Sequence, residues 1–125
     1  MNLILSIAAG GAVGAVLRHF VNIGGSTLFL GFPYSTMVVN IVGSFLMGAA
    51  VIAFSQITNL SEDLKAFIII GVLGSFTTFS AFSYDLFDLC NRGEALQAFT
   101  YGFVSVLLSI GGLLAGMMLL KQFVA

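Results

Sequence analysis

Charged residues are so sparse in this sequence that they divide it into long uncharged runs. These runs are residues 1–17, 20–61, 66–84 and 95–120. Because a helix needs about 20 apolar residues to cross a bilayer, the second run is roughly twice as long as one crossing requires. It must therefore contain a turn, and the turn signals cluster in the stretch GGSTLFLGFPYS, which contains Gly24, Gly25, Gly31 and the only proline, Pro33. The charge pattern predicts four membrane-spanning helices.

Composition supports a membrane location. Of the 125 residues, 59% are hydrophobic and 7% are charged, and the mean hydropathy is +1.13. This leaves too little polar surface to cover a water-soluble globule, so the chain is predicted to be an integral membrane protein. Four basic residues are too few to neutralise a phosphate backbone, which excludes nucleic acid as a partner. The single cysteine, Cys90, cannot form an intrachain disulfide.

We expect one all-α transmembrane domain over residues 1–125. Its helices are predicted near 3–23, 34–55, 65–89 and 95–121, with connections at 24–33, 56–64 and 90–94. Ser61 is the expected N-cap of the third helix. The first apolar run lacks the preceding basic residue that is typical of a signal peptide, so we interpret it as a retained span.

Basic residues near the span ends give no preferred orientation. With four crossings, Lys65 and Lys121 lie on the side of the termini, and Arg18 and Arg92 lie on the opposite side. Since an excess of Lys and Arg marks the cytoplasmic side, this balance has two interpretations. It can arise by chance in a chain with few charges. Alternatively, the protein inserts in both orientations and works as an antiparallel homodimer.

Small residues one helical turn apart predict close helix crossings. The motifs are Gly10-x-x-x-Gly14 and Gly112-x-x-x-Gly116, a spacing that lets backbones approach where lipid supplies no hydrophobic drive. Glycine is common in membrane helices, so each motif alone is weak. We expect Gly14 to support contact between two copies of the chain.

Two stripes of polar side chains run along predicted spans. One consists of Thr36, Asn40 and Ser44, and the other of Tyr101, Ser105 and Ser109. Each repeats every four residues and so extends about 12 Å along one helix face. An isolated hydroxyl can bond to the carbonyl four residues earlier, but the amide of Asn40 has no such local partner. A polar group at mid-span usually faces an interior or a water path.

The middle of each predicted span lacks Asp, Glu and Lys. A proton-coupled carrier would need a buried carboxylate, whereas hydroxyls, amides and the positive edges of aromatic rings suit an anion. The stretch GSFTTFS at residues 74–80 would allow a helix broken at mid-membrane. The competing interpretation is that Phe76, Phe79 and Phe82 form one apolar stripe.

Three stretches resemble the signature blocks of the Fluc, or CrcB, family of bacterial fluoride channels. They are GGAVGAVLRH (10–19), STMVVNIVGSFLMG (35–48) and GVLGSFTTFSAFSYD (71–85), in the family's order and spacing. The resemblance implies a dual-topology antiparallel homodimer in the bacterial inner membrane. It implies two passive fluoride pores that export cytoplasmic fluoride, and a structural sodium ion, Na+, at the dimer interface.

The resemblance also implies roles for individual residues. Those of the pore and its fluoride sites would be Asn40, Phe79, Phe82, Thr36, Ser80, Tyr101, Ser105, Ser109 and Arg18. The carbonyls of Gly74 and Thr77 would bind sodium. The sequence departs from the family pattern at His19, Ser35 and Ala81, none of which has one of these roles.

Two other classes of protein fit the composition. A small four-helix proton-coupled multidrug exporter also has dual topology, but it carries a glutamate in its first span, and residues 1–17 contain none. A subunit without transport activity would leave the polar stripes and Asn40 unexplained. An enzyme is the weakest interpretation, because no nucleophile is paired with a base and His19 is the only histidine.

Overall fold

The computed structural model describes residues 2–28 and 31–124, and these residues are helical apart from short connections. In order, the elements are α1 (Leu3–Leu28), α2 (Tyr34–Ser55), α3 (Glu62–Lys65), the π-helix η1 (Ala66–Leu73), α4 (Gly74–Phe76), α5 (Phe79–Asn91) and α6 (Ala95–Val124). Among the described residues, four helical segments are long and apolar enough to cross a membrane. The third of these runs from α3 to α5 and consists of several pieces.

The helix ends follow the prediction for α2 and differ by a few residues elsewhere. Ser61 caps the third segment as expected, since its Oγ accepts a hydrogen bond from the Leu64 N–H at 3.2 Å. The first helix was predicted to end at residue 23, but α1 continues through Gly24 and Gly25. A glycine inside a helix costs only about 1 kcal/mol, less than the loss of several backbone hydrogen bonds. Residues 29 and 30 of the expected connection lie outside the described residues.

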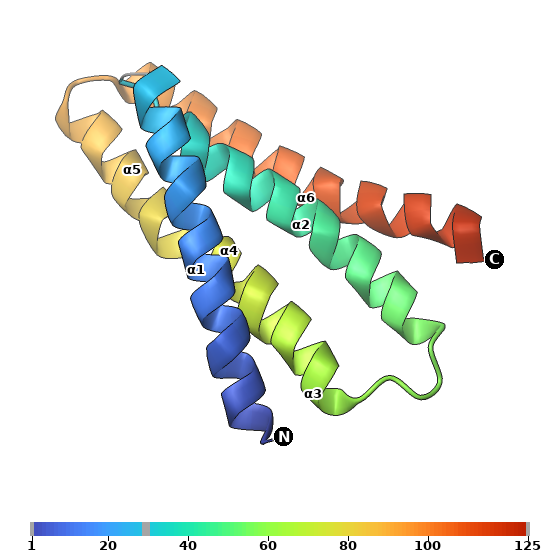
Figure 1. Cartoon of the computed structure of the whole chain (residues 1–125). Coiled ribbons are helices and arrows are strands. Elements are labelled where there is room, and N and C mark those ends of the chain that lie inside the picture. The colour runs from blue at the N-terminus through green and yellow to red at the C-terminus, as the bar shows by residue number, and fades with distance from the viewer. Residues whose placement is uncertain (1, 29–30, 125) are drawn as a thin grey trace.

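The helices form two closely packed pairs (Figure 1). In one pair α1 lies along η1 and α4, and in the other α2 lies along α6. The pairs diverge toward the connection at residues 56–61, between α2 and α3. Glycine brings the backbones together in both: Gly10 lies against Gly71, and Gly116 lies against the carbonyl of Phe45. A Cβ at either glycine would overlap backbone atoms of the neighbouring helix.

The first glycine motif therefore acts within one chain. A Cβ on Gly14 would overlap the carbonyl oxygen of Val72, in η1. Since this glycine is buried against its own chain, the expectation that it joins two copies is wrong. The sequence correctly indicated a close helix crossing, but spacing alone does not say whether the partner helix belongs to the same chain.

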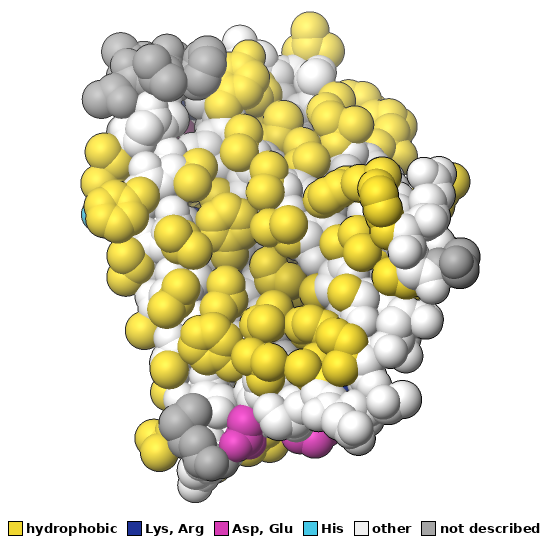
Figure 2. All heavy atoms as spheres, turned by 45° about the vertical axis from the view of Figure 1, so that its right-hand side comes forward, with side chains coloured by type: hydrophobic (Ala, Val, Ile, Leu, Met, Phe, Trp, Pro, Cys, Tyr) yellow, Lys and Arg dark blue, Asp and Glu magenta, His cyan; other side chains and the backbone are white. Residues whose placement is uncertain are grey.

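The buried core is small and lies at the end of the molecule where α5, α6 and the residues before α2 meet. Its cluster consists of Phe82, Leu89, Ala98 and Tyr101, with Phe32, Met37 and Leu86 packed against it. Most other large apolar side chains face outward. Figure 2 shows one such face, covered by hydrophobic side chains with acidic ones only at its lower edge. This distribution is typical of a chain whose outer surface meets lipid.

Candidate functional site

The third segment is interrupted at two threonines. Helix α4 ends at Phe76 and α5 begins at Phe79, and between them Thr77 (φ −81°, ψ 157°) and Thr78 (φ −152°, ψ 117°) have extended backbone. The side chain of Thr78 caps α5, because its Oγ1 accepts a hydrogen bond from the Ala81 N–H at 3.1 Å. The interruption separates Phe76 from the two later phenylalanines, so the interpretation of these rings as one continuous stripe is wrong.

Asn40 of α2 holds this interruption in place. Its Nδ2 donates to the carbonyl of Thr78 at 3.0 Å, and its Oδ1 accepts from the Thr78 N–H at 2.7 Å. The partner that the sequence could not identify for this amide is thus the backbone of Thr78, in the third segment. An amide nitrogen carries a second N–H, and Asn40 also lines the cavity described below.

Two hydrogen bonds near the threonines, one to Asn40 and one to the Thr78 hydroxyl, leave carbonyls of the third segment without their helical donors. In a continuous α-helix, the carbonyl of Gly74 would accept from the N–H of Thr78, four residues later. That N–H donates to Asn40 instead. In the same way, the carbonyl of Thr77 would accept from the Ala81 N–H, which donates to the Thr78 hydroxyl. Gly74 and Thr77, the two residues expected to bind sodium, therefore carry carbonyls without their helical donors.

A cavity of about 290 Å³ opens beside the interruption, between α2, α5 and α6. We call it the Asn40 cavity. Its walls consist of Asn40, Ser44, Thr77, Thr78, Phe79, Phe82, Ser105, Val106, Ser109 and Ile110. It brings together five of the predicted pore residues, and all of its lining side chains are uncharged. The ring of Phe82 is buried, whereas that of Phe79 is 77% exposed on the open side.

The hydroxyl of Ser105 is the polar group in this cavity most suited to a ligand. Its side chain is 3% exposed and its Oγ has no hydrogen-bond partner among the described residues. Other hydroxyls on these helices bond to the carbonyl four residues earlier, as Thr77 does to Leu73 at 3.0 Å and Thr100 does to Leu96 at 2.9 Å. Because a buried unpaired hydroxyl is unfavourable, its position beside a cavity indicates a site for a hydrogen-bond acceptor.

The polar stripes continue from the Asn40 cavity to a second one of about 520 Å³, which we call the Asp88 cavity. Thr36 lines it, one turn of α2 before Asn40. Tyr101 is fully buried and lines neither cavity, but its ring packs on Phe82 of the Asn40 cavity. Its hydroxyl donates to Oδ2 of Asp85, which lines the Asp88 cavity, at 2.9 Å. Sequence reasoning gave Asp85 no role. The signal available was an acid just inside a span, which needs a donor from a neighbouring helix.

Besides Tyr101, two predicted pore residues line neither of these cavities. Arg18 lies on α1 and lines neither of them. Ser80 is exposed in the first turn of α5, with its hydroxyl 3.3 Å from that of Thr78. Their roles in a pore remain predictions from the resemblance. Ser44, by contrast, lines the Asn40 cavity, as its place in the polar stripe suggested.

Comparison with known proteins gives a consistent family. Residues 5–117 match the family model described as CrcB-like protein, Camphor Resistance (CrcB). A protein from Rhodospirillum centenum named fluoride-specific ion channel FluC is 44% identical to this chain, and the match covers 100% of both chains. A protein of the same name from Cereibacter sphaeroides is 46% identical over 98% of this chain and 97% of its own length. Another from Shewanella halifaxensis is 48% identical over 78% of this chain and 79% of its own length. The chain therefore belongs to the CrcB family.

Proposed function

We propose that this protein is a passive, fluoride-selective channel that exports fluoride from the cytoplasm. The observation that carries the proposal is the Asn40 cavity, where phenylalanine rings and an unpaired buried hydroxyl meet without any charged side chain. The relatives named above are fluoride-specific channels, a class distinct from enzymes. A multidrug exporter gains no support from these relatives, and the cavity lacks the carboxylate that such an exporter needs.

Fluoride would cross by exchanging water for weak donors. The Ser105 hydroxyl offers an O–H, and the rings of Phe79 and Phe82 offer electropositive edges. A fluoride ion is small and strongly hydrated, so it needs close donors on all sides, whereas a larger chloride would not fit narrow walls. Neutral donors also bind the ion weakly enough for it to leave. The second polar stripe would then lead the ion past Tyr101 toward the Asp88 cavity.

The functional unit would be an antiparallel homodimer with two pores. A folded monomer of 13.1 kDa is expected to expose roughly 6,400 Å², and this chain exposes 7547 Å². Part of the excess lies at the Asn40 cavity, where Phe79, Val106 and Ile110 are exposed. A second copy would cover these side chains and complete the walls. The balance of Lys65 and Lys121 against Arg18 and Arg92 suits insertion in both orientations.

Cys90 provides a direct test of dual topology. It is the only cysteine and is exposed near the end of α5. If the protein inserts both ways, a membrane-impermeant maleimide should label about half of the Cys90 thiols on intact cells that lack the outer membrane, and the rest after permeabilisation. Labelling that is complete or absent from the outside would show a single orientation.

A sodium ion at the centre of this dimer would use the released carbonyls. Gly74 and Thr77 fit such a site, since each carries a carbonyl without its helical donor, and alkali ions are bound by oxygen ligands of this kind. Two copies would supply four carbonyls. When bound, the ion would link the two copies through these carbonyls. The site would lie where the third segments are interrupted, near the middle of the bacterial inner membrane.

The deciding experiment is anion efflux from liposomes that contain the purified protein. Valinomycin should let K+ leave the liposomes and so balance the charge of the anions, while a fluoride electrode follows fluoride release. In a matched chloride gradient, a chloride electrode should follow chloride release. Fast fluoride release with little chloride release is expected. Equal release of the two ions, or no release from a well-folded dimer, would overturn the proposal.

A further inference from the structure

Five aromatic rings form a continuous chain from the helix interruption to the end of the molecule. The ring centroids of Phe79 and Phe82 are 5.7 Å apart, and those of Phe82 and Tyr101 are 5.2 Å apart. Tyr101 meets Phe32 edge to face at 5.6 Å and 89°. Phe32 in turn contacts Tyr34 at 4.4 Å. This chain of rings links the predicted pore residues to Phe32, in the connection before α2, which sequence analysis did not identify.

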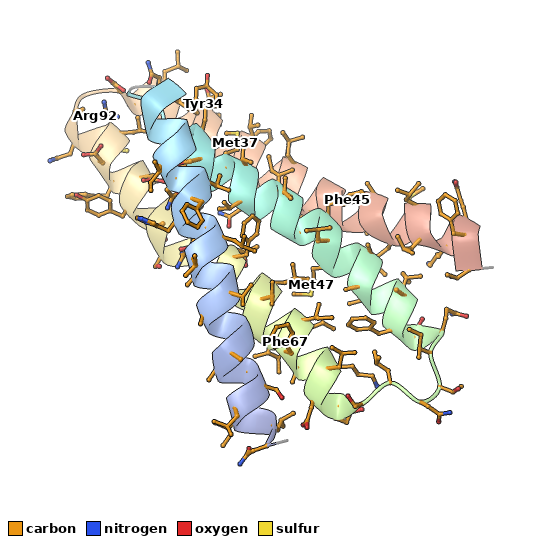
Figure 3. The ribbon with its side chains drawn as sticks, in the orientation of Figure 1. Tyr34, Met37, Phe45, Met47, Phe67 and Arg92 are labelled. Atoms are coloured by element: carbon orange, nitrogen blue, oxygen red, sulfur yellow. The ribbon has the colours of Figure 1, made fainter. Side chains whose placement is uncertain are left out.

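The backbone around Phe32 is fixed by a turn at Gly31 and by hydrogen bonds on either side of it. Gly31 has a φ of +93°, which favours glycine, and the Tyr34 N–H donates to the Phe32 carbonyl at 2.9 Å. The Nη2 of Arg92 donates to the Gly31 carbonyl at 2.9 Å, while its Nε lies 3.2 Å from a carboxylate oxygen of Asp88. Figure 3 shows Tyr34 and Arg92 at the same end of the molecule. Arg92 therefore ties this connection to the end of α5.

Phe32 lies between two open spaces. It lines the Asp88 cavity and also a further cavity of about 500 Å³, which Glu94 and Gln97 line. Its ring is half-buried and packs on the core cluster that contains Tyr101. Removing the ring would join the two spaces beside Tyr101. Tyr101 would then lose one of the two rings that contact it and would gain contact with water.

We propose that Phe32 is a positioning residue of the anion path, which holds Tyr101 against Phe82 and Asp85. This inference rests on the proposed channel function. The ring of Tyr101 packs on Phe82, which lines the Asn40 cavity, and its hydroxyl bonds to Asp85, which lines the Asp88 cavity. Its orientation would therefore shape the path of an ion from one cavity to the other. The rings of Phe82 and Phe32 both contact that of Tyr101. Arg92 acts one step further away, since it fixes the backbone next to Phe32.

The test compares Phe32→Ala with Phe32→Tyr and with Phe99→Ala. Phe99 is 70% exposed on α6 and stacks only on Phe103 among the ring contacts of the described residues, so it is a matched loss of one ring away from the path. We expect Phe32→Ala to slow fluoride efflux at least tenfold, and Phe32→Tyr and Phe99→Ala to stay within twofold of wild type. The final extent of efflux, which reports the share of liposomes with working protein, should be unchanged.

A second readout follows Tyr101 itself. The chain has three tyrosines, so protein labelled with 3-fluorotyrosine should give separate fluorine NMR signals that Tyr→Phe variants assign. The Tyr101 signal should shift and broaden in Phe32→Ala and stay unchanged in Phe99→Ala. Wild-type rate and an unchanged Tyr101 signal in Phe32→Ala would overturn the inference while leaving the channel intact. So would a loss of final extent at normal rate, which indicates only poorer folding. Wild-type liposomes without fluoride efflux would instead overturn the channel function and this inference with it.

Discussion

Asn40 and Thr78 lie 38 positions apart, yet the Asn40 side chain takes the place of the backbone groups that would bond to Thr78 in a continuous helix. Both backbone groups of Thr78 that a helix would use, its N–H and its carbonyl, are hydrogen-bonded to the Asn40 amide. This one pairing ends α4, orients the start of α5, and withdraws the donor from the Gly74 carbonyl. It therefore connects the Asn40 cavity with the carbonyl of Gly74, one of the two proposed to bind sodium.

Replacing Asn40 should damage both structure and transport. In Asn40→Leu the Thr78 peptide loses both side-chain partners, and leaving buried polar groups unpaired costs about 1–3 kcal/mol. We expect a lower melting temperature in detergent and loss of most fluoride efflux. Thr100→Ala is the control, because it removes an exposed hydroxyl that bonds only to its own helix. A melting temperature equal to that of wild type would show that this pairing adds nothing to stability.

Ser105→Ala should separate transport from stability. The Ser105 hydroxyl is buried without a partner, so removing it should leave the free energy of unfolding unchanged or raise it by about 1 kcal/mol. Fluoride efflux should nevertheless fall, since the cavity loses an O–H donor. Thermal unfolding and electrode traces on the same preparations measure the two effects. If efflux is retained in full, Ser105 does not contact the ion.

The two phenylalanines of the Asn40 cavity should differ in their structural cost. Phe82 is 7% exposed and packs on Tyr101, whereas Phe79 is 77% exposed in the single chain. We expect Phe82→Ile to lower the free energy of unfolding by about 1 kcal/mol and Phe79→Ile to change it less, while both slow fluoride efflux. Size-exclusion chromatography should show an unchanged assembly. Full efflux in either variant would remove that ring from the path.

Gly14→Ala should destabilise the single chain. Its new Cβ would overlap the Val72 carbonyl, and such overpacking costs about 1–3 kcal/mol. Gly111→Ala is the matched control, since a Cβ there meets no atom within 4 Å. Chemical unfolding at several protein concentrations distinguishes packing within one chain from contact between two chains. A defect that disappears at high concentration would mean that Gly14 acts between chains after all.

Sodium should stabilise the protein if the released carbonyls bind it. A ligand that binds only the folded state raises stability with its concentration, so the melting temperature should rise in NaCl and remain constant in N-methylglucamine chloride at equal ionic strength. In Asn40→Leu the Thr78 N–H is free to return to the Gly74 carbonyl, and the sodium dependence should weaken. Equal melting temperatures in the two salts with the wild type would argue against the site.

The sequence predicted the four spans well, because charge and hydropathy are local properties that the bilayer requires in every crossing. It also predicted much of the cavity, since residues four apart share a helix face, and Asn40, Ser105 and Ser109 line one space. Contacts between distant segments could not be predicted in this way. The partner of Asn40 and the contact of Tyr101 with Asp85 depend on how helices pack.

The π-helix η1 was also beyond prediction. Its residues, AFIIIGVL, would suit an ordinary membrane helix, and nothing in their pattern marks the wider turn. Gly71 lies within it against Gly10, so close packing with α1 accompanies the change.

The pairing of Asn40 with Thr78 also bears on how the chain assembles in the bilayer. Residues 77 and 78 include neither proline nor glycine, so both can also adopt helical backbone. In lipid, an isolated segment must satisfy its own peptide groups, and it would do so as an unbroken helix. The interruption at residues 77 and 78 would then form only when α2 packs against the third segment and Asn40 bonds to Thr78. A synthetic peptide of residues 62–91 in lipid vesicles should accordingly stay helical through both threonines.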